Sequence, residues 1–294
     1  MEKFVVEKKL LSVVIATLGG GSLKKTIEHL NAGSVVPFEI LICIPMENSA
    51  KVDDLFFDNV RVIKTACSGQ VSQRSVGFKR STGRFVLQLD DDMFVEKKCL
   101  ENLINIIGDQ AKVAVAPALL YVSNKKSFYQ RPPNIFFLKL YYWILNGKSG
   151  HQPGKITLAG TNIGVDPEHV KENIIDVEWV PGGCLLHSRS NIITDDFYPF
   201  KGKAYSEDLY HSYFLIKNRI KLKICTSSKC FLDDDVPVYD FSFTDFYQFF
   251  KSDLKARKYL VYLSKKSINR MYMYYFFVML RYFLRQIKIK WSIK

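Results

Sequence analysis

The chain has 294 residues and a mass of 34.0 kDa, enough for one large domain or two modest ones. Its 48% hydrophobic and 24% charged residues are typical of a globular protein and exclude a disordered or fibrous chain. The net charge of +13 is concentrated near the C-terminus: residues 251–294 include twelve Lys or Arg and one acid, so the rest of the chain is nearly neutral.

The first 120 residues alternate short β-rich apolar runs with amphipathic segments, which is typical of βαβ units. Strands are predicted at 11–17, 38–44, 59–64, 84–89 and 112–121, and helices at about 22–30, 70–82 and 97–107. A less regular middle is followed by a helix at 206–218 and a strand at 221–225. We expect an α/β domain over residues 1–240, with a mixed sheet flanked by helices, and a helical basic tail over residues 241–294.

The six cysteines form no C-x-x-C pair and show no spacing typical of a metal finger. Charged residues interrupt the first ten positions before any apolar run develops, which argues against a signal peptide. We therefore expect reduced thiols and a cytoplasmic protein.

Gly19, Gly20 and Gly21 directly follow the first predicted strand. They do not complete a dinucleotide-binding G-x-G-x-x-G motif, because Lys24 stands at the third glycine position, and the phosphate-binding G-x-x-x-x-G-K-[ST] motif is absent. The turn either joins a strand to a helix or lines a nucleotide pocket. In both cases it lies at the edge where open α/β sheets bind ligands.

Asp90, Asp91 and Asp92 follow the fourth predicted strand with no intervening turn residue. Adjacent carboxylates repel one another unless a positive group lies among them. Mn²⁺ or Mg²⁺ with hard oxygen ligands is the natural counter-charge, and such ions often share their shell with a substrate phosphate. The alternative is an exposed acidic turn that caps the next helix.

The segment before this cluster has a G-x-x-x-x-R-x-x-G pattern formed by Gly69, Arg74 and Gly77, followed by G-R-F-V-L-Q-L-D-D-D from Gly83. The order of these motifs resembles that of the inverting family 2 glycosyltransferases of the GT-A fold, of the bacterial surface-polysaccharide type. Those enzymes transfer a sugar from a nucleotide-sugar to an acceptor hydroxyl. One position departs from the family pattern, because Ser75 stands where the family usually has Asn. Arg74 has an alternative interpretation, since an arginine at this position would also suit a helix surface.

The resemblance implies roles for individual residues on the donor side. The D-x-D motif of the family corresponds to Asp90–Asp92, so Mn²⁺ or Mg²⁺ is expected on Asp90 and Asp92. The expected donor contacts are Thr17, Arg74, Asp90 and Asp91. The family's usual acid at the end of the second strand is missing or shifted to Glu47, which leaves the nucleobase open.

A second group of motifs continues the resemblance. Trp179, Gly182 and Gly183 are similar to the W-x-x-G-G segment that lies on the acceptor side of the donor sugar, although the glycines alone would also suit a turn. Glu207 and Asp208 match an E-D pair, 116 positions after Asp92. The resemblance implies that Asp208 is the general base and that Glu207 supports the acceptor side. Acids in the first turn of a helix also favour its dipole, which is the structural alternative.

Two further polar groups are weaker candidates. His211 lies one turn beyond Glu207 and is interpreted as a helix-face residue rather than a catalyst. The acidic run 233–235 lies close to where relatives often place a histidine that touches metal or diphosphate, and Asp233 either takes that role or belongs to an acidic loop.

The tail is aromatic and basic. Its longest uncharged run, 271–280, is too short to span a bilayer. Arg281, Arg285 and Lys288 share one helical face amid aromatic residues, which favours a helix lying in an anionic membrane interface over one that packs on the body. Nucleic acid is not expected as a partner. The aromatic run 135–145 is either a second membrane contact or core.

Together these features predict a metal-dependent inverting glycosyltransferase, peripheral on the inner face of the cell membrane, whose acceptor is a lipid-linked glycan of O-antigen or capsule type. The alternatives are a non-catalytic membrane adaptor that uses the basic tail, and a nucleotidyltransferase that uses the same acidic metal site.

Overall fold

A computed structural model describes residues 10–66, 68–201, 203–234 and 242–292, with backbone alone for 287–292. Its contacts divide the chain into unit 1 (Met1–Gln130 and Val165–Val238) and unit 2 (Arg131–Gly164 and Tyr239–Lys294). The second boundary lies near the expected residue 240. Residues 131–164 were expected in the first domain, but their contacts group them with the C-terminal helices.

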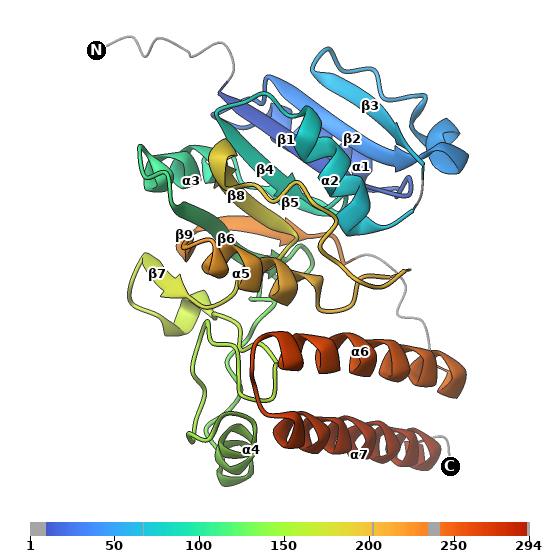
Figure 1. Cartoon of the computed structure of the whole chain (residues 1–294), viewed down its shortest axis with the longest axis vertical. Coiled ribbons are helices and arrows are strands. Elements are labelled where there is room, and N and C mark those ends of the chain that lie inside the picture. Colours follow the sequence, from blue (N-terminus) through green and yellow to red (C-terminus); the bar gives the residue numbers. More distant parts are fainter. Residues whose placement is uncertain (1–9, 67, 202, 235–241, 293–294) are drawn as a thin grey trace. The chain divides into compact units, whose positions relative to one another are not determined.

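Unit 1 is built on one mixed sheet (Figure 1). Its described strands are β1 (Leu11–Ala16), β2 (Glu39–Pro45), β3 (Val60–Thr65), β4 (Phe85–Leu89), β5 (Met93–Val95), β6 (Val113–Tyr121), β7 (Ile174–Val177), β8 (Cys184–Ser188) and β9 (Lys221–Leu232). The order is β3-β2-β1-β4-β8-β6-β9-β5, with β7 also paired to β9. The first four of these run parallel, whereas β8 is antiparallel to both β4 and β6.

Helices cover both faces of this sheet. They are α1 (Leu23–Asn31), α2 (Gln70–Arg80), α3 (Cys99–Ile107) and α5 (Glu207–Lys217), with short 3₁₀ turns η1 (Met46–Val52), η2 (Pro167–His169) and η3 (Arg189–Asn191). Side chains alternate along each strand, so Val13 and Ile15 pack with α1 and α3 while Val14 packs with Phe78 of α2. The α/β fold predicted from the sequence is confirmed, although β9 extends seven residues beyond the predicted end.

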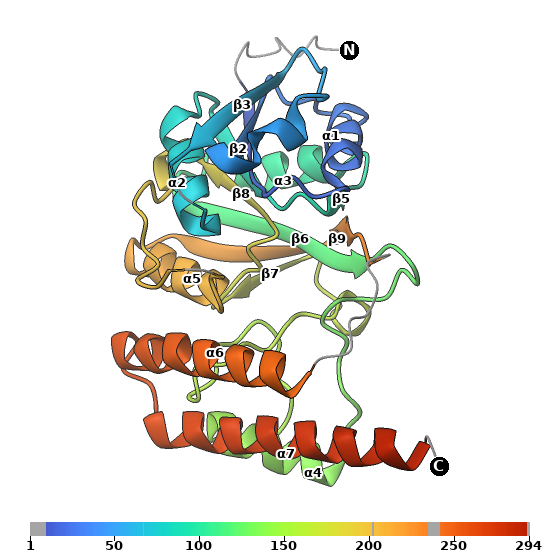
Figure 2. The ribbon, with the colours of Figure 1, turned by 90° about the vertical axis from the view of Figure 1, so that its right-hand side faces the viewer.

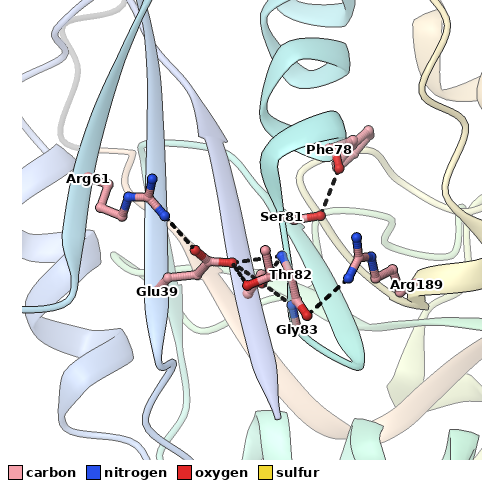
Figure 3. A network of polar contacts seen from close by, with 8 residues as sticks. Glu39, Arg61, Phe78, Ser81, Thr82, Gly83 and Arg189 are labelled. Atoms are coloured by element: carbon pink, nitrogen blue, oxygen red, sulfur yellow. Dashed lines mark hydrogen bonds and ion pairs between the residues drawn. The ribbon is translucent and has the colours of Figure 1, made fainter. Parts of the chain in front are cut away.

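A buried carboxylate ties the amino ends of three strands together (Figure 3). Glu39 of β2 accepts hydrogen bonds from Ser12 Oγ (2.6 Å) and from Thr82 N (2.8 Å) and Oγ1 (3.1 Å), and it pairs with Arg61 at 3.3 Å. Ser12 Oγ in turn accepts from Gly83 N at 2.8 Å. A Cβ at Gly83 would lie 2.6 Å from Ser12 N, so this position requires glycine. This network therefore anchors β1, β2 and β4 at the end of the sheet away from their carboxyl termini.

Unit 2 consists of α4 (Phe136–Asn146), α6 (Phe243–Leu263) and α7 (Ile268–Ser292), shown with their loops in Figure 2. A capping box between Ser242 and Asp245 begins α6. The helices α6 and α7 pack through Val261, Met271 and Tyr275. None of the helices in the described part of the chain is long and apolar enough to cross a membrane.

The helix α4 is held against α7 by polar and aromatic contacts. Arg270 Nη1 donates to the carbonyl oxygen of Trp143 at 2.8 Å, and the rings of Tyr141 and Phe277 meet edge to face with centroids 5.5 Å apart. Because α4 belongs to residues 131–164, this packing explains why that segment joins unit 2.

Candidate active site

The carboxyl ends of β1 and β4 bring together residues that are far apart in the sequence. These strands are parallel neighbours, so Thr17 lies beside the acidic cluster, and its hydroxyl donates to Asp91 Oδ2. Thr26 Oγ1 of α1 donates to the backbone oxygen of Asp91 at 2.8 Å. A Cβ at Gly20 would lie 2.9 Å from Asp91 Oδ2, so the glycine turn closes directly over this carboxylate. Burial raises the pKa of Asp91 above its usual range.

The guanidinium of Arg74 is buried and joins the two acidic motifs. Its Nη1 donates to Glu207 Oε1 at 2.6 Å, and its Nη2 donates to Asp90 Oδ1 and, at 3.3 Å, to the carbonyl oxygen of Gly182. Burial by itself lowers the pKa of Arg74, but the Glu207 and Asp90 carboxylates outweigh it and hold that pKa above its usual value. Arg74 is therefore a permanent cation between Asp90 and Glu207, and not a residue of the helix surface.

The paired glycines allow the backbone to approach both carboxylates. A Cβ at Gly182 would lie 2.5 Å from Glu207 Oε1, and one at Gly183 would lie 3.2 Å from Asp90 Oδ2. The backbone nitrogen of Asp90 donates to the carbonyl oxygen of Gly183 at 2.9 Å. A larger residue at Gly182 would collide with the carboxylate that Arg74 holds.

Glu207 and Asp208 begin α5, where the two side chains have different surroundings. Glu207 is buried against Arg74, whereas Asp208 is half-buried and accepts from the backbone nitrogen of Leu209 at 2.9 Å. Ser206 precedes them in the left-handed region at φ 57°, an uncommon conformation for a residue other than glycine. Its side chain makes no helix-capping hydrogen bond, so capping does not explain the local sequence.

Tyr129 is an aromatic residue whose phenol senses Asp208. Burial, and next the negative charge of Asp208, raise the pKa of Tyr129 well above its usual value. The rings of Tyr129 and Trp179 meet edge to face at 5.3 Å. We predicted Trp179 on the acceptor side, but its side chain is fully buried in the structure. Trp179 thus packs against Tyr129 as a buried residue.

Asp92 and Asp233 lie next to each other, and both carry carboxylates close to the acidic cluster. Burial, then Asp90, Asp91 and Asp233, raise the pKa of Asp92 to about 6. The backbone nitrogen of Asp233 donates to the backbone oxygen of Asp92 at 2.9 Å, and its Oδ2 accepts from Ser22 Oγ at 2.8 Å. Ser22 thus directly precedes α1, but its hydroxyl binds Asp233 and makes no capping hydrogen bond. Asp235 of the same acidic run lies outside the described residues.

The donor set suits a divalent cation of the Mg²⁺ or Mn²⁺ type. Within the described ranges, no three His, Cys, Asp or Glu side chains converge as a complete metal site. Such ions need only one or two carboxylates when substrate phosphates and water supply the other oxygens. The mutual repulsion of the carboxylates around Asp92 is the feature that a bound cation would relieve.

Sequence reasoning missed three glutamines that organise the site. Gln70 Nε2 donates to Asp90 Oδ1 at 3.0 Å, and Gln88 Nε2 to the carbonyl oxygen of Gly182 at 2.6 Å. Gln73 Nε2 donates hydrogen bonds to the carbonyl oxygens of Thr17 and Cys43 at the ends of β1 and β2. Gln88 stands out as a polar residue within an apolar strand, and Gln70, Gln73 and Arg74 share one helix face. A polar residue in an apolar strand and a polar helix face both indicate buried hydrogen bonds, and these features of the sequence could have revealed the three glutamines.

A pocket of about 410 Å³ opens beside Gln70, between the start of α2 and the loop 196–204. Its lining combines hydroxyl, carboxylate, ammonium and aromatic groups, namely Ser68, Ser72, Asp196, Tyr198, Phe200 and Lys201. Glu47, the position to which the family's nucleobase acid is shifted if it is present at all, is exposed in η1.

An open α/β sheet with acidic and glycine-rich segments gathered at the carboxyl ends of β1 and β4 defines a GT-A-type domain. Residues 12–162 match the model of the family described as glycosyl transferase family 2, which is half of the chain. The chain belongs to this family. No curated protein sequence matches it.

Two solved structures share the fold at low sequence identity. The chain is similar to GalNAc-T7, solved with UDP, GalNAc and Mn²⁺, at a TM-score of 0.55 and 15% identity, covering 82% of this chain and 47% of that one. It is also similar to residues 1–349 of S. aureus TarS, solved with UDP-GlcNAc, at a TM-score of 0.51 and 14% identity, covering 84% and 66%. The chain therefore spans about half of the first structure and just under two thirds of the second.

Proposed function

We propose that this protein transfers a sugar from a nucleotide-sugar donor to an acceptor hydroxyl with inversion at the anomeric carbon. The observation that carries the proposal is the bridge from Asp90 through Arg74 to Glu207, because it joins the donor-side and acceptor-side motifs in one site. Membership of the family supports the reaction class.

Asp208 is the general base of the proposed reaction. Its carboxylate takes the proton of the acceptor hydroxyl while that oxygen attacks the anomeric carbon from the face opposite the leaving group. The bond between the anomeric carbon and the diphosphate oxygen breaks, and a nucleoside diphosphate leaves. Glu207 is held by Arg74 through its Oε1, so we assign it a supporting role and leave the proton transfer to Asp208.

Asp90 and Asp92 are the residues that would hold the divalent cation with the donor diphosphate. When bound, such a cation stabilises the negative charge that grows on the leaving diphosphate. Arg74 and Gln70 fix the Asp90 carboxylate, and Thr17 fixes that of Asp91, so the cluster is oriented before the donor arrives.

UDP is the first nucleotide to test, because both structural neighbours were solved with a uridine nucleotide and one of them also with Mn²⁺. The test is a thermal-shift panel of UDP, dTDP, GDP and CMP with and without Mn²⁺. We expect one nucleoside diphosphate to raise the Tm in a metal-dependent way, and expect Asp92→Ala to abolish the rise. A folded protein that responds to none of them would refute the proposal.

We also propose that the acceptor is a glycan carried on a membrane lipid, in bacterial O-antigen or capsule synthesis, and that the protein works at the inner face of the cell membrane. The basic, aromatic C-terminal segment supports this location. Transfer of labelled sugar from the donor into a lipid extract of bacterial membranes tests it, and label confined to water-soluble products would contradict it.

A further inference from the structure

The net charge of the chain resides in unit 2. Its segments 131–164 and 239–294 contain sixteen Lys or Arg and three acids, a net charge of +13 that equals that of the whole chain. Unit 1 is consequently neutral. The four basic residues within 131–164 are not matched by a single acid there, so the basic character is not confined to the C-terminal tail.

The helix α4 exposes its apolar side chains. Phe136, Leu140 and Trp143 follow one another at i, i+4 and i+7 and are 44–74% exposed, and Phe137 beside them is 76% exposed. Leu145 is the buried residue of this helix. Much of the aromatic run 135–145 therefore lies at the surface, which argues against its interpretation as core. A helix face that contacts only water would carry polar residues at these positions.

The helix α7 has a matching stripe. Among the described side chains of α7, seven apolar residues away from the buried Met271 and Tyr275 are 40–64% exposed: Tyr272, Met273, Phe276, Met279, Leu280, Phe283 and Leu284. Arg281 and Arg285 are exposed at the edge of this stripe. Lys288, the third basic residue predicted on this face, has no described side chain. The arrangement of an apolar stripe edged by Arg is that of a helix lying in a lipid headgroup layer.

The two stripes belong to one packed pair of helices. Arg270 and the Tyr141–Phe277 contact hold α4 to α7, so both helices meet a partner together. We propose that α4 and α7 form one docking surface that inserts its exposed aromatic and aliphatic side chains into the interface of an anionic phospholipid bilayer. This inference deepens the membrane location proposed above, and it assigns half of the contact to a helix within residues 131–164.

The surface chemistry favours a bilayer over other partners. Phe, Leu, Met and Trp on uncharged stripes gain free energy by leaving water, whereas Arg and Lys around them attract anionic headgroups. A nucleic-acid site would instead place basic side chains across the face, between a few stacking aromatics.

The test measures co-sedimentation of the full-length protein with phosphatidylcholine vesicles that contain or lack phosphatidylglycerol. We expect binding to the anionic vesicles and a loss of about tenfold or more in partitioning for Phe136→Ser/Phe137→Ser and for Phe276→Ser/Phe283→Ser. The matched controls Phe56→Ser in unit 1 and Tyr262→Ser in α6, at 86% and 75% exposure, should bind as the unmodified protein does. Arg281→Glu/Arg285→Glu should weaken binding to the anionic vesicles in particular.

Trp143 provides a direct report of insertion. In a Trp291→Phe background the remaining tryptophans are Trp143 and the fully buried Trp179. Brominated phospholipids should therefore quench Trp143 if α4 inserts. Absence of quenching while the vesicles still sediment with the protein would overturn the role of α4.

Other outcomes would overturn the proposal as a whole. These are no vesicle binding, binding of RNA in place of vesicles, or a dimer in sedimentation that Phe136→Ser/Phe137→Ser dissociates. The nucleotide-induced rise in Tm, measured on the same variants, should be unchanged. Failure of the docking surface is thereby distinguished from failure of the proposed transfer reaction.

Discussion

Arg74 and Glu207 lie 133 positions apart in the chain, yet Arg74 Nη1 donates to Glu207 Oε1 over 2.6 Å in the interior of unit 1. The same guanidinium holds Asp90. A buried cation bound to two carboxylates fixes the acidic cluster after β4 against the start of α5. The donor-side and acceptor-side motifs are thereby held in one site.

Arg74→Ala should destabilise the fold by about 3–5 kcal/mol, because two carboxylates would remain buried without their cation. Chemical denaturation measures this change. Arg84→Ala is the matched control: its pair with Asp109 spans 2.7 Å but is exposed on both sides, so its loss should cost at most about 1 kcal/mol. Equal costs for the two substitutions would contradict the role of Arg74 as an internal link.

Gly182→Ala should lower both the Tm and the rate of donor turnover. The added Cβ would lie 2.5 Å from Glu207 Oε1, and relieving that overlap should cost about 1–3 kcal/mol. Gly21→Ala, where no atom lies within 4 Å of the added Cβ, should leave stability unchanged. Full activity and Tm in the Gly182 variant would show that the loop does not hold Glu207 as described.

Glu39→Ala should reduce stability by about 2–4 kcal/mol while leaving nucleotide affinity intact. The substitution leaves the buried hydroxyl of Ser12 and the backbone nitrogen of Thr82 without their acceptor, at the amino ends of the strands and away from the site. Denaturation and nucleotide titration of the same sample separate the two effects, with Glu28→Ala on the exposed side of α1 as control. A large loss of nucleotide affinity would argue against this separation.

Two buried histidines should make the fold sensitive to acid. Burial lowers the pKa of His187 to about 3 and that of His211 well below its usual value, and their ring centroids lie 5.4 Å apart. Because the folded-state pKa is lowered, the stability that the neutral rings provide is complete above about pH 6.5 and is lost as the pH falls towards 3.

Between pH 6.5 and 5, the free energy of unfolding should fall by about 2 kcal/mol for each histidine that stays neutral in the folded protein. His187→Leu should flatten the dependence of unfolding free energy on pH across this window, whereas the exposed His29→Gln should not. Because the raised pKa values of Asp91 and Asp92 act in the opposite direction, the test is the difference between variants: a His187→Leu profile as steep as that of the unmodified protein would contradict the burial of these rings.

Much of unit 1 could be predicted because its information is local. Continuous apolar runs such as β1 have the signature of buried parallel strands, and Asp90–Asp92 are adjacent in the sequence. The Arg74 bridge could not be predicted, because it depends on how α2 and α5 lie over the same sheet face. The burial of Trp179 was not predictable for the same reason: a sequence motif indicates proximity to a site but not which side chain is exposed.

The aromatic run 135–145 illustrates a second limit. Its hydrophobicity suits both a core helix and a surface helix, and periodicity alone does not distinguish them. The structure shows Phe136 and Phe137 exposed on a helix that packs on α7, which only the tertiary contacts reveal.

The most direct test of the account compares Asp208→Asn with the unmodified protein in nucleotide binding and in donor turnover. Binding is titrated with the nucleoside diphosphate found in the thermal-shift panel, and turnover is followed as release of that diphosphate from its sugar conjugate. Loss of the base should leave the dissociation constant unchanged while turnover falls by about 10²–10⁴. Unchanged turnover in a variant that still binds nucleotide would contradict Asp208 as the base and, with it, the proposed mechanism.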